Sequence, residues 1–281
     1  MEQLLKRMAE DLGIRGYSPR TIKSYVQATR RFLEWSRKDL QALGMDDVRA
    51  YLVYLKQERR LSGSTINQAL CGVRFLFLRV LRRSWDREGL RCHKRRRQLP
   101  VVLTRAEVQR LLGATSSLRQ RALLTTIYST GLRVSEAVSL AIRDIDSQAG
   151  RIHIRNGKGG QDRYALLSPR LVELLREYWR AYRPKVWLFP SQRPDRPIGT
   201  RIVQRACRRA RDVAGLRKQV TPHTLRHSFA THLLESGVSL PYIQHLLGHR
   251  AIASTMIYLK ISNEAATAIP SPLDLLPDSW T

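Results

Sequence analysis

The stretch from residue 221 to residue 258 concentrates side chains that can act on a phosphodiester. His223 and Arg226 are three residues apart, so a helix would place both on one face. His249 follows a second short apolar segment, and Tyr258 comes nine residues later. Guanidinium and imidazole groups can hold the oxygens of a phosphate, and a tyrosine hydroxyl is a nucleophile. The spacing therefore predicts a site that cuts a phosphodiester bond.

Two cationic residues from earlier in the chain can complete this site. Arg133 stands at the expected start of a helix, where unpartnered backbone amides also favour phosphate. Lys158 lies in the glycine-rich turn at residues 156 to 160, which could enter a groove of a nucleic acid. Each residue alone also fits an ordinary role, Arg133 and Lys158 as solvated charges and Tyr258 as a half-buried core residue. Their combination is what favours catalysis.

The remaining histidines and the cysteines have simpler interpretations. His223 and His227 are four residues apart, but no HExxH pattern or carboxylate ligand accompanies them, so we predict no metal site. We interpret His227, His232 and His245 as residues that pack or that support the site from behind. The cysteines are far apart and lack zinc spacing, which predicts buried thiols of a reducing compartment: Cys71, Cys92 and Cys207.

The composition favours nucleic acid as the partner. The 281 residues carry 50 Lys and Arg against 23 Asp and Glu, a formal charge of +27. The excess is +13 over residues 1 to 99 and +14 over residues 100 to 281. A polyanion compensates such a surplus, and its even spread predicts that duplex DNA contacts both halves, as in a clamp. No stretch is apolar enough for a membrane span and no leading segment resembles a signal peptide, so we expect no membrane partner.

The first 90 residues are expected to form a small bundle of three or four helices. Ser18 and Pro19 open one helix, and apolar residues recur every three or four positions from Ile22 to Leu33. The same period recurs around Leu52 and around Leu70. The polar faces of these helices carry cations that either meet solvent or contact DNA: Arg30, Arg31, Lys56, Arg59, Arg60 and Arg74.

A basic linker and a second domain are expected next. Residues 91 to 100, RCHKRRRQLP, predict an interdomain linker that lies on DNA phosphates. Thr104, followed by Glu107, has the pattern of a capped helix, and we expect the second domain to begin with this helix. The linker brings four more candidates for DNA contact: Lys94, Arg95, Arg96 and Arg97.

The second half predicts helices around one small sheet. A helix over residues 118 to 128 is expected to break at residues 129 to 131. Residues 151 to 155 alternate in polarity, and residues 161 to 167 can form the partner strand. We therefore predict a fold that is mainly α with a small antiparallel β-sheet. A strongly basic helix is expected over residues 202 to 214, with further candidates for DNA contact: Arg205, Arg208 and Arg209.

The C-terminal segment has an unusual composition for a tail. Its prolines forbid a continuous helix, while its other residues are too apolar to stay in solvent. We expect residues 263 to 281 to dock on a neighbouring surface. The residues concerned are Pro270, Pro272, Leu273, Leu275, Leu276, Pro277 and Trp280.

Five motifs together resemble the successive catalytic boxes of the tyrosine recombinases, the phage-integrase and Xer-type family. They are TGLRVSEAVSL at 130 to 140, NGKGG at 156 to 160, HTLRHSFATHLLESG at 223 to 237, IQHLLGH at 243 to 249 and STMIY at 254 to 258. Residues 18 to 35 resemble the opening of the family's helical core-binding domain. The resemblance implies an N-terminal helical core-binding bundle (1 to 90), the linker (91 to 100), a C-terminal α+β catalytic domain (101 to 262) and the tail (263 to 281).

The resemblance also implies a mechanism. Arg133, Lys158, His223, Arg226, His249 and Tyr258 correspond one to one to the family's catalytic set. Tyr258 would attack a DNA phosphate and leave a 3′-phosphotyrosyl link and a 5′-hydroxyl, which then rejoins a partner strand without metal, ATP or another cofactor. The proton of Tyr258 would pass to His223, and Lys158 would protonate the leaving oxygen. Lys260 stands where the family often has histidine, which affects no catalytic role.

Partners and alternatives follow from the same resemblance. It implies double-stranded DNA, a homo-oligomer that is a tetramer on paired sites, accessory directionality proteins, and a cytoplasmic, nucleoid-associated protein. A type IB topoisomerase shares this chemistry, but a separate helical domain and an apolar tail favour site-specific recombination and integration. A DNA-binding regulator that has lost the reaction is a second alternative. It predicts decay of a catalytic position, and all six are present.

Overall fold

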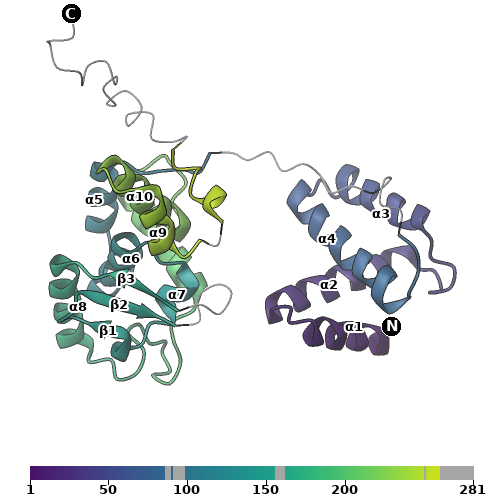
Figure 1. The fold of residues 1–281 in the computed structure, drawn as a ribbon, viewed down its shortest axis with the longest axis horizontal. Helices are drawn as coiled ribbons and strands as arrows, with labels where there is room; N and C mark the ends of the chain where they lie inside the picture. The colour runs from purple at the N-terminus through teal and green to yellow at the C-terminus, as the bar shows by residue number, and fades with distance from the viewer. Residues whose placement is uncertain (86–89, 91–98, 156–161, 250, 260–281) are drawn as a thin grey trace, which may run out of the picture. The chain divides into compact units, whose positions relative to one another are not determined.

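The computed structural model describes residues 1–85, 90, 99–155, 162–249 and 251–259. The chain divides into two compact units, Met1–Arg97 and Gln98–Thr281 (Figure 1). The predicted fold class is confirmed, because the described residues are mainly helical and include one three-stranded antiparallel sheet. No helix in these described ranges is both long enough and apolar enough to cross a membrane.

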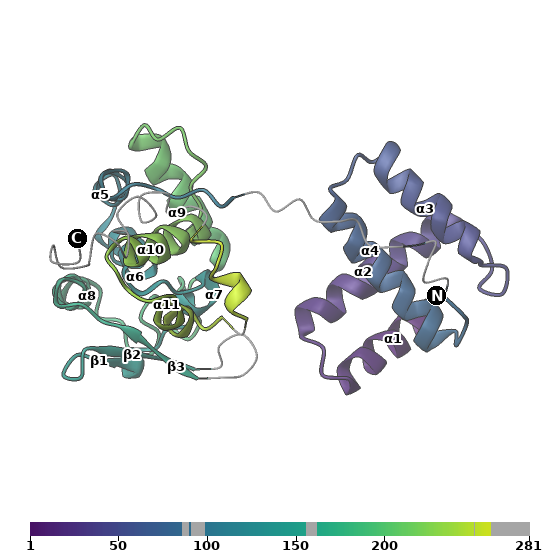
Figure 2. The same ribbon diagram turned by 45° about the horizontal axis from the view of Figure 1, so that its top comes forward.

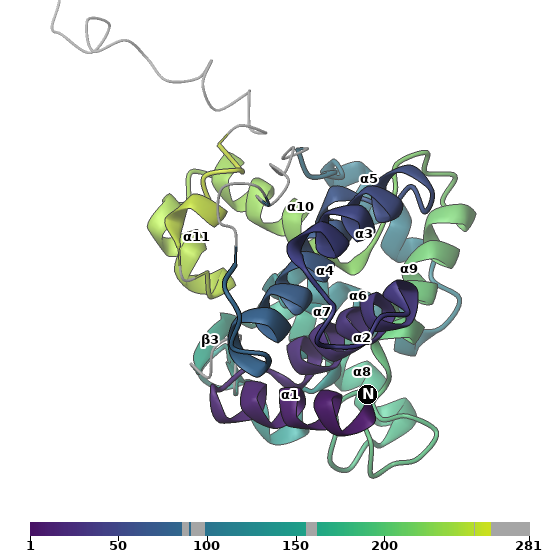
Figure 3. The same ribbon diagram turned by 90° about the vertical axis from the view of Figure 1, so that its right-hand side faces the viewer.

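The first unit is a helical bundle, as predicted, and Figure 3 shows it from a second direction. Its first helix was not predicted separately. Buried leucine, methionine, valine and aromatic side chains form its core. The elements are α1 (Glu2–Ile14), α2 (Pro19–Ser36), α3 (Met45–Gln57), α4 (Gly63–Phe75) and a π-helical turn, η1 (Leu76–Val80).

Helix α2 illustrates why this sequence folds locally as it does. The Ser18 hydroxyl accepts a hydrogen bond from the amide of Thr21 at 3.2 Å, and Pro19 occupies the first helical position. Phe32 on the apolar face is completely buried. Helix α4 approaches α2 closely at Gly72, where an added Cβ would lie 2.9 Å from a backbone oxygen of α2. A side chain at position 72 would therefore push the two helices apart.

The second unit contains the sheet and the remaining helices, seen together in Figure 2. Its core is a continuous apolar cluster contributed by α5 to α10 and the strands. The elements are α5 (Arg105–Gly113), α6 (Leu118–Thr130), α7 (Val134–Val138), η2 (Ile142–Asp144), β1 (Ile145–Asp146), β2 (Arg151–Ile154), β3 (Arg163–Leu166), α8 (Pro169–Tyr182), α9 (Thr200–Val213), α10 (Pro222–Glu235), α11 (Leu240–Leu247) and η3 (Ile252–Ser254).

The sheet confirms the predicted strand pair and adds a strand. The order is β1-β2-β3, with both neighbours antiparallel. Ile152 faces Ala165 across the pair, and both are buried, as the alternation predicts. The two-residue strand β1 is too short to leave a pattern and was not predicted. The turn at residues 156 to 160 lies outside the described residues.

The contact between the end of α6 and α10 positions residues of the candidate site. The predicted break at residues 129 to 131 is too early, because α6 continues through Thr130 and only Gly131 ends it. Gly131 has φ +63°, and an added Cβ would come within 2.4 Å of the Phe229 ring on α10. Both the backbone conformation and this close approach require glycine. The chain therefore turns directly beside α10 and delivers Arg133 to it.

Candidate active site

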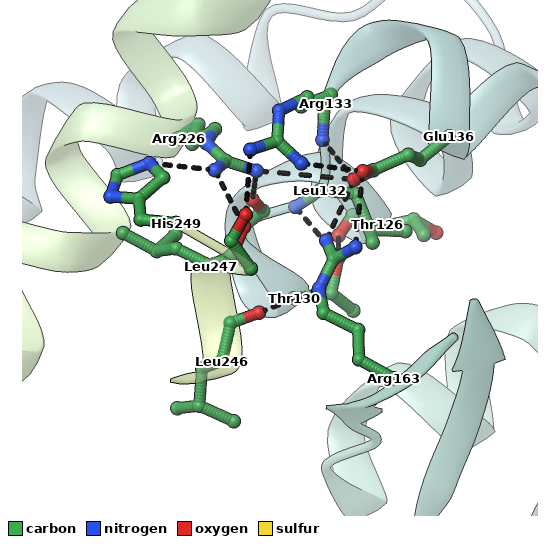
Figure 4. Close-up of polar contacts among 12 residues, drawn as sticks. Thr126, Thr130, Leu132, Arg133, Glu136, Arg163, Arg226, Leu246, Leu247 and His249 are labelled. Carbon is green, nitrogen blue, oxygen red and sulfur yellow. Dashed lines mark hydrogen bonds and ion pairs between the residues drawn. The ribbon is translucent and has the colours of Figure 1, made fainter. Parts of the chain in front are cut away.

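Three of the predicted catalytic residues meet in the second unit (Figure 4). Arg133 precedes the short helix α7, Arg226 lies on α10, and His249 follows α11. Arg133 donates to the carbonyl of Gly248 at 3.0 Å, which ties the start of α7 to the end of α11. Lys158 lies outside the described residues. Segments more than a hundred residues apart in the sequence thus converge on one point.

Arg226 is the most buried of these cations, at 3% exposure. Its guanidinium donates to the carbonyls of Gly131 and Leu247, both at 2.8 Å. Burial, together with the charge of Arg133, lowers the pKa of Arg226 to about 10, so it stays charged at neutral pH. Carbonyl oxygens carry no full charge, so these two contacts fix the guanidinium in place without neutralising its positive charge.

Glu136 is the carboxylate at the centre of the cluster. It accepts hydrogen bonds from Arg133 at 2.7 Å and, through both oxygens, from Arg163 at 2.7 and 3.0 Å. Arg226 lies 3.9 Å from the same carboxylate. Burial by itself would raise the pKa of Glu136, but the hydrogen bonds and charges of Arg163 and Arg133 hold it at about 2. Three guanidinium groups share one carboxylate, and the remaining positive charge suits an anion.

Arg163 is a buried member of the cluster that was not predicted from the sequence, and neither was Glu136. It begins β3, is 8% exposed, and also donates through Nε to the carbonyl of Leu246 at 3.0 Å. One guanidinium thus joins the sheet to α7 and to α11. Of the backbone amides at this helix start, that of Arg133 itself is not open for phosphate, because it donates to Glu136 at 2.9 Å.

His249 has its two ring nitrogens in different roles. Its Nε2 lies 3.0 Å from a guanidinium nitrogen of Arg226, and its Nδ1 lies 2.9 Å from the hydroxyl of Thr255. Arginine has no acceptor, so Nε2 must accept, and the ring hydrogen is then on Nδ1. Burial and the nearby charge of Arg226 lower the pKa of His249 to about 4, consistent with a neutral ring. His249 was expected to donate to phosphate, whereas here it accepts from Arg226.

Tyr258 is buried beside α10, at 1% exposure, within a small apolar cluster that includes Phe229 and Leu247. Its hydroxyl lies 3.0 Å from Nδ1 of His227. Burial raises the pKa of Tyr258, and the charges of Arg226 and Arg133 oppose that rise. The phenol therefore keeps its proton at neutral pH while lying within the field of the two arginines.

The histidines of α10 and α11 agree only in part with their predicted roles. His227 was interpreted as a packing or supporting residue, yet it contacts the expected nucleophile directly. His223 is exposed, and its ring centre lies 6.5 Å from that of His227. His232 is buried and pairs with the hydroxyl of Tyr128 at 2.8 Å, which confirms its packing role. His245 is exposed, so the packing interpretation is wrong for it.

Metal-binding and thiol chemistry have little support among the described residues. In those ranges, no group of three or more His, Cys, Asp or Glu side chains is arranged to hold a metal ion. Cys207 is completely buried, and burial raises the pKa of its thiol to about 12, as expected for an inert core residue. Cys92 lies outside the described ranges.

Comparison with known proteins identifies the family. The sequence profile described as "Phage integrase family" matches residues 101–265, and the profile "Phage integrase, N-terminal SAM-like domain" matches residues 4–87. The chain belongs to the phage integrase family of tyrosine recombinases. The predicted resemblance is confirmed, and both units of the structure fall within it.

Individual relatives agree with this assignment. This tyrosine recombinase is 45% identical, over 99% of its length and 90% of the relative, to y4qK of Sinorhizobium fredii (strain NBRC 101917 / NGR234), which is named an integrase/recombinase. It is 36% identical to tyrosine recombinase XerA of Thermococcus kodakarensis, over 93% of this chain and 92% of the relative. A crystal structure of XerA recombinase matches with a TM-score of 0.56 and 32% identity, over 95% and 96% of the two chains. XerH bound to difH in a pre-cleavage complex has the same fold, with a TM-score of 0.73 and 24% identity over 96% and 85%.

The first unit of this recombinase carries a cleft bordered by predicted DNA-contact residues. The cleft has a volume of about 560 Å³ and lies between α2, α3 and α4. Arg31 and Arg59 line it, with Trp35 and Tyr51 among its apolar residues. By contrast, Arg30 on the neighbouring face of α2 forms an ion pair with Glu2.

The other candidates for DNA contact lie mostly on exposed faces. Lys56, Arg60 and Arg74 are exposed on the first unit. The basic helix α9 exposes a row of arginines while it buries Val203, Cys207 and other small apolar residues. That row contains the predicted Arg205, Arg208 and Arg209. The linker candidates fall outside the described residues: Lys94, Arg95, Arg96 and Arg97.

Proposed function

We propose that this chain is a site-specific recombinase and integrase that cuts and rejoins double-stranded DNA through a 3′-phosphotyrosyl intermediate. The observation that carries the proposal is the convergence of Arg133, Arg226 and His249 beside a buried Tyr258, within a domain of the phage integrase family. The relatives named above are recombinases and integrases, which favours this function over DNA relaxation or silent DNA binding.

The proposed roles follow from the geometry. Arg133 and Arg226 hold the non-bridging oxygens of the scissile phosphate, since their positions are already fixed by Glu136 and by backbone carbonyls. His249 joins them once phosphate displaces its contact with Arg226. Tyr258 attacks the phosphorus, and Lys158 protonates the departing 5′-oxygen. The covalent link conserves the bond energy, so we propose no metal, ATP or other cofactor. His223, on the exposed side of α10, faces the bound strand.

The partners are proposed from the relatives and from the charge. XerH is described in complex with difH, and lambda integrase as a tetramer bound to a Holliday junction. We propose that this chain likewise assembles as a homo-tetramer on paired DNA sites, with accessory directionality proteins, and that it associates with the nucleoid. Residues 1 to 90 would bind the core site, the 91 to 100 linker would cross phosphates, residues 101 to 262 would catalyse, and residues 263 to 281 would dock on a neighbouring protomer.

The nucleophile is tested by Tyr258→Phe on a nicked substrate that traps the covalent intermediate. We expect the wild-type chain to form an adduct with the 3′-phosphate strand and the variant to bind the same DNA without forming one. The matched control is Tyr128→Phe, which removes another tyrosine hydroxyl that pairs with a histidine of α10. An adduct that persists in Tyr258→Phe would overturn the assignment of the nucleophile.

A further inference from the structure

The contact between Tyr258 and His227 is not explained by the roles above. Its two partners come from different elements, since His227 lies on α10 and Tyr258 follows η3. The ring centres are 5.7 Å apart and the rings are tilted by 52°, so they are not stacked, and the polar contact is made by the hydroxyl. The hydroxyl of a nucleophile that must lose a proton is therefore already paired, at 3.0 Å, with a ring nitrogen.

The direction of this hydrogen bond follows from the chemistry of its partners. Tyr258 is buried, so its hydroxyl hydrogen needs an acceptor within the protein. Nδ1 of His227 is the acceptor that the described contacts provide. A neutral imidazole with its hydrogen on Nε2 can take this role. The pair then has the arrangement that proton transfer requires, namely a hydroxyl donor facing a basic nitrogen at hydrogen-bond distance.

We propose that His227 is a further catalytic residue of this recombinase and accepts the proton of Tyr258 during strand cleavage. The inference rests on the proposed function and deepens it. The O–H bond of Tyr258 breaks as its proton moves to Nδ1 of His227. The Oη–P bond then forms, the bond from phosphorus to the 5′-oxygen breaks, and that oxygen takes a proton from Lys158. Rejoining reverses each transfer, so the His227 imidazolium returns its proton to Tyr258.

The surroundings of His227 explain why its ring would accept the proton of Tyr258 only when substrate is bound. Burial, with the charges of His223 and Arg226, lowers the pKa of His227 to about 4. Tyr258 and His249 also face it, and both are neutral at rest. A bound phosphodiester brings a negative charge against Arg226, which removes part of the repulsion and raises the pKa of His227. The base is therefore weak in the unbound protein and strengthened by the substrate.

From the sequence, His223 was expected to accept the proton of Tyr258, but the geometry favours His227. The described hydrogen bond of Tyr258 is to His227, whereas His223 lies one turn earlier on α10 and is exposed. A proton transfer needs heavy-atom contact or one bridging water. His227 satisfies that condition directly, and His223 remains in position to contact the phosphate.

The decisive variant is His227→Asn in the full-length chain, assayed on the nicked substrate. The asparagine amide oxygen can replace Nδ1 as an acceptor, so it keeps Tyr258 in place, but it cannot take up a proton. We expect DNA affinity to stay unchanged and the cleavage rate at pH 7 to fall by roughly 10² to 10³-fold. The rate of the variant should then rise with pH, because solvent must remove the proton. Fluorotyrosine at position 258, whose phenol is more acidic, should recover part of the loss.

The control for this variant is His232→Asn. His232 lies on the same helix and pairs through Nδ1 with the hydroxyl of Tyr128 at 2.8 Å, so the same substitution disturbs α10 in a similar way. It should cleave at nearly the wild-type rate. If His227→Asn fails to fold, His227→Ala with added imidazole provides the second measurement, and recovery of cleavage by imidazole supports the proposal.

Three results would overturn the inference while leaving the proposed function intact. The first is a wild-type cleavage rate in His227→Asn, which would make His227 a positioning residue only. The second is faster cleavage in His227→Asn, which would make the contact a restraint on Tyr258. The third is a loss that neither fluorotyrosine nor pH alters. By contrast, a wild-type chain that forms no adduct would refute the proposed function itself.

Discussion

Two sets of arginines, one around the candidate site of the second unit and one at the cleft of the first unit, are held in opposite ways. In the second unit, Arg226 and Arg163 are buried, and each makes several hydrogen bonds to fixed oxygens. In the first unit, Arg31 and Arg59 stand exposed at the border of an open cleft. The buried group is organised before DNA arrives, whereas the exposed group must lose side-chain freedom on binding.

This difference matches what each unit has to do. A transition state develops charge at a defined point, so donors that are already fixed stabilise it without reorganisation. Contacts to the sugar-phosphate backbone along a site need only approximate positions, and flexible cations serve them well. Under the proposed function, positive charge would therefore serve catalysis where the fold buries it and DNA binding where the fold exposes it. The comparison predicts large, local effects in the second unit and small, additive effects in the first.

The largest effect is expected for Arg226→Lys. Lysine keeps the charge but cannot reach Gly131 and Leu247 with two separate donors while also facing a phosphate. We expect cleavage of the nicked substrate to fall by roughly 10² to 10³-fold, as for loss of one transition-state donor. The affinity for DNA should change by much less. Single-turnover cleavage and a binding assay on the same substrate measure the two quantities.

The control variant is Arg151→Lys, which makes the same substitution at an exposed arginine. Arg151 lies on β2, pairs with the exposed Asp146 at 3.4 Å and covers the ring of Tyr164. The same substitution there should leave cleavage within a few-fold of wild type. A similar loss in both variants would show that the buried arrangement of Arg226 gives it no special role.

The next effect concerns stability and comes from Glu136→Gln. The substitution keeps the shape of the side chain but removes the carboxylate that three buried or half-buried arginines share. Breaking a buried ion pair by removing one partner costs about 3 to 5 kcal/mol, and we expect a loss of that order in the second unit. Urea denaturation followed by circular dichroism measures it, with the transition of the first unit as an internal reference. Asp146→Asn, at an exposed pair, should have little effect.

The same carboxylate predicts how stability depends on pH. The folded pKa of Glu136 is about 2, below its ordinary value of 4.5, so its contribution is fully present above pH 4.5 and is lost as pH falls toward 2. The difference corresponds to roughly 3 kcal/mol. Denaturation curves between pH 6 and pH 3 should show a steeper decline for the wild-type chain than for Glu136→Gln. Parallel declines in the two proteins would contradict the low pKa.

The elements that carry the site were largely predictable from local signals. Thr104 and Glu107 start α5 as their spacing indicates, with contacts of 2.8 and 3.2 Å between them. Ser18 caps α2, and Thr221 caps α10. These signals depend only on neighbours in the sequence. The candidate catalytic residues could likewise be recognised from the sequence, because few residue types can hold a phosphate or act as a nucleophile.

Two of the residues that organise the motif, Arg163 and His227, could not be predicted in the same way. Arg163 looks like one more surface cation in a strand, and only the packing of β3 against α11 shows that it is buried. Glu136 had a local signal, since it lies three residues after Arg133 at a helix start, the position of a capping carboxylate. His227 had none, because its contact depends on where Tyr258 returns to α10, 31 residues later in the chain.

The smallest expected effect lies in the first unit and tests the exposed side of the comparison. Arg31 lines the cleft, whereas the adjacent Arg30 is engaged by Glu2, so the two offer a matched pair on one helix. We expect Arg31→Gln to weaken DNA binding several-fold and to reduce the slope of log affinity against log salt by about 1, the value for one phosphate contact. Arg30→Gln should change the slope less, because its guanidinium must first leave a carboxylate. Cleavage by the bound complex should be the same in both variants. A change in the cleavage rate of bound Arg31→Gln, with no change in the salt slope, would mean that the exposed arginines also act on catalysis and that the division between the two units is wrong.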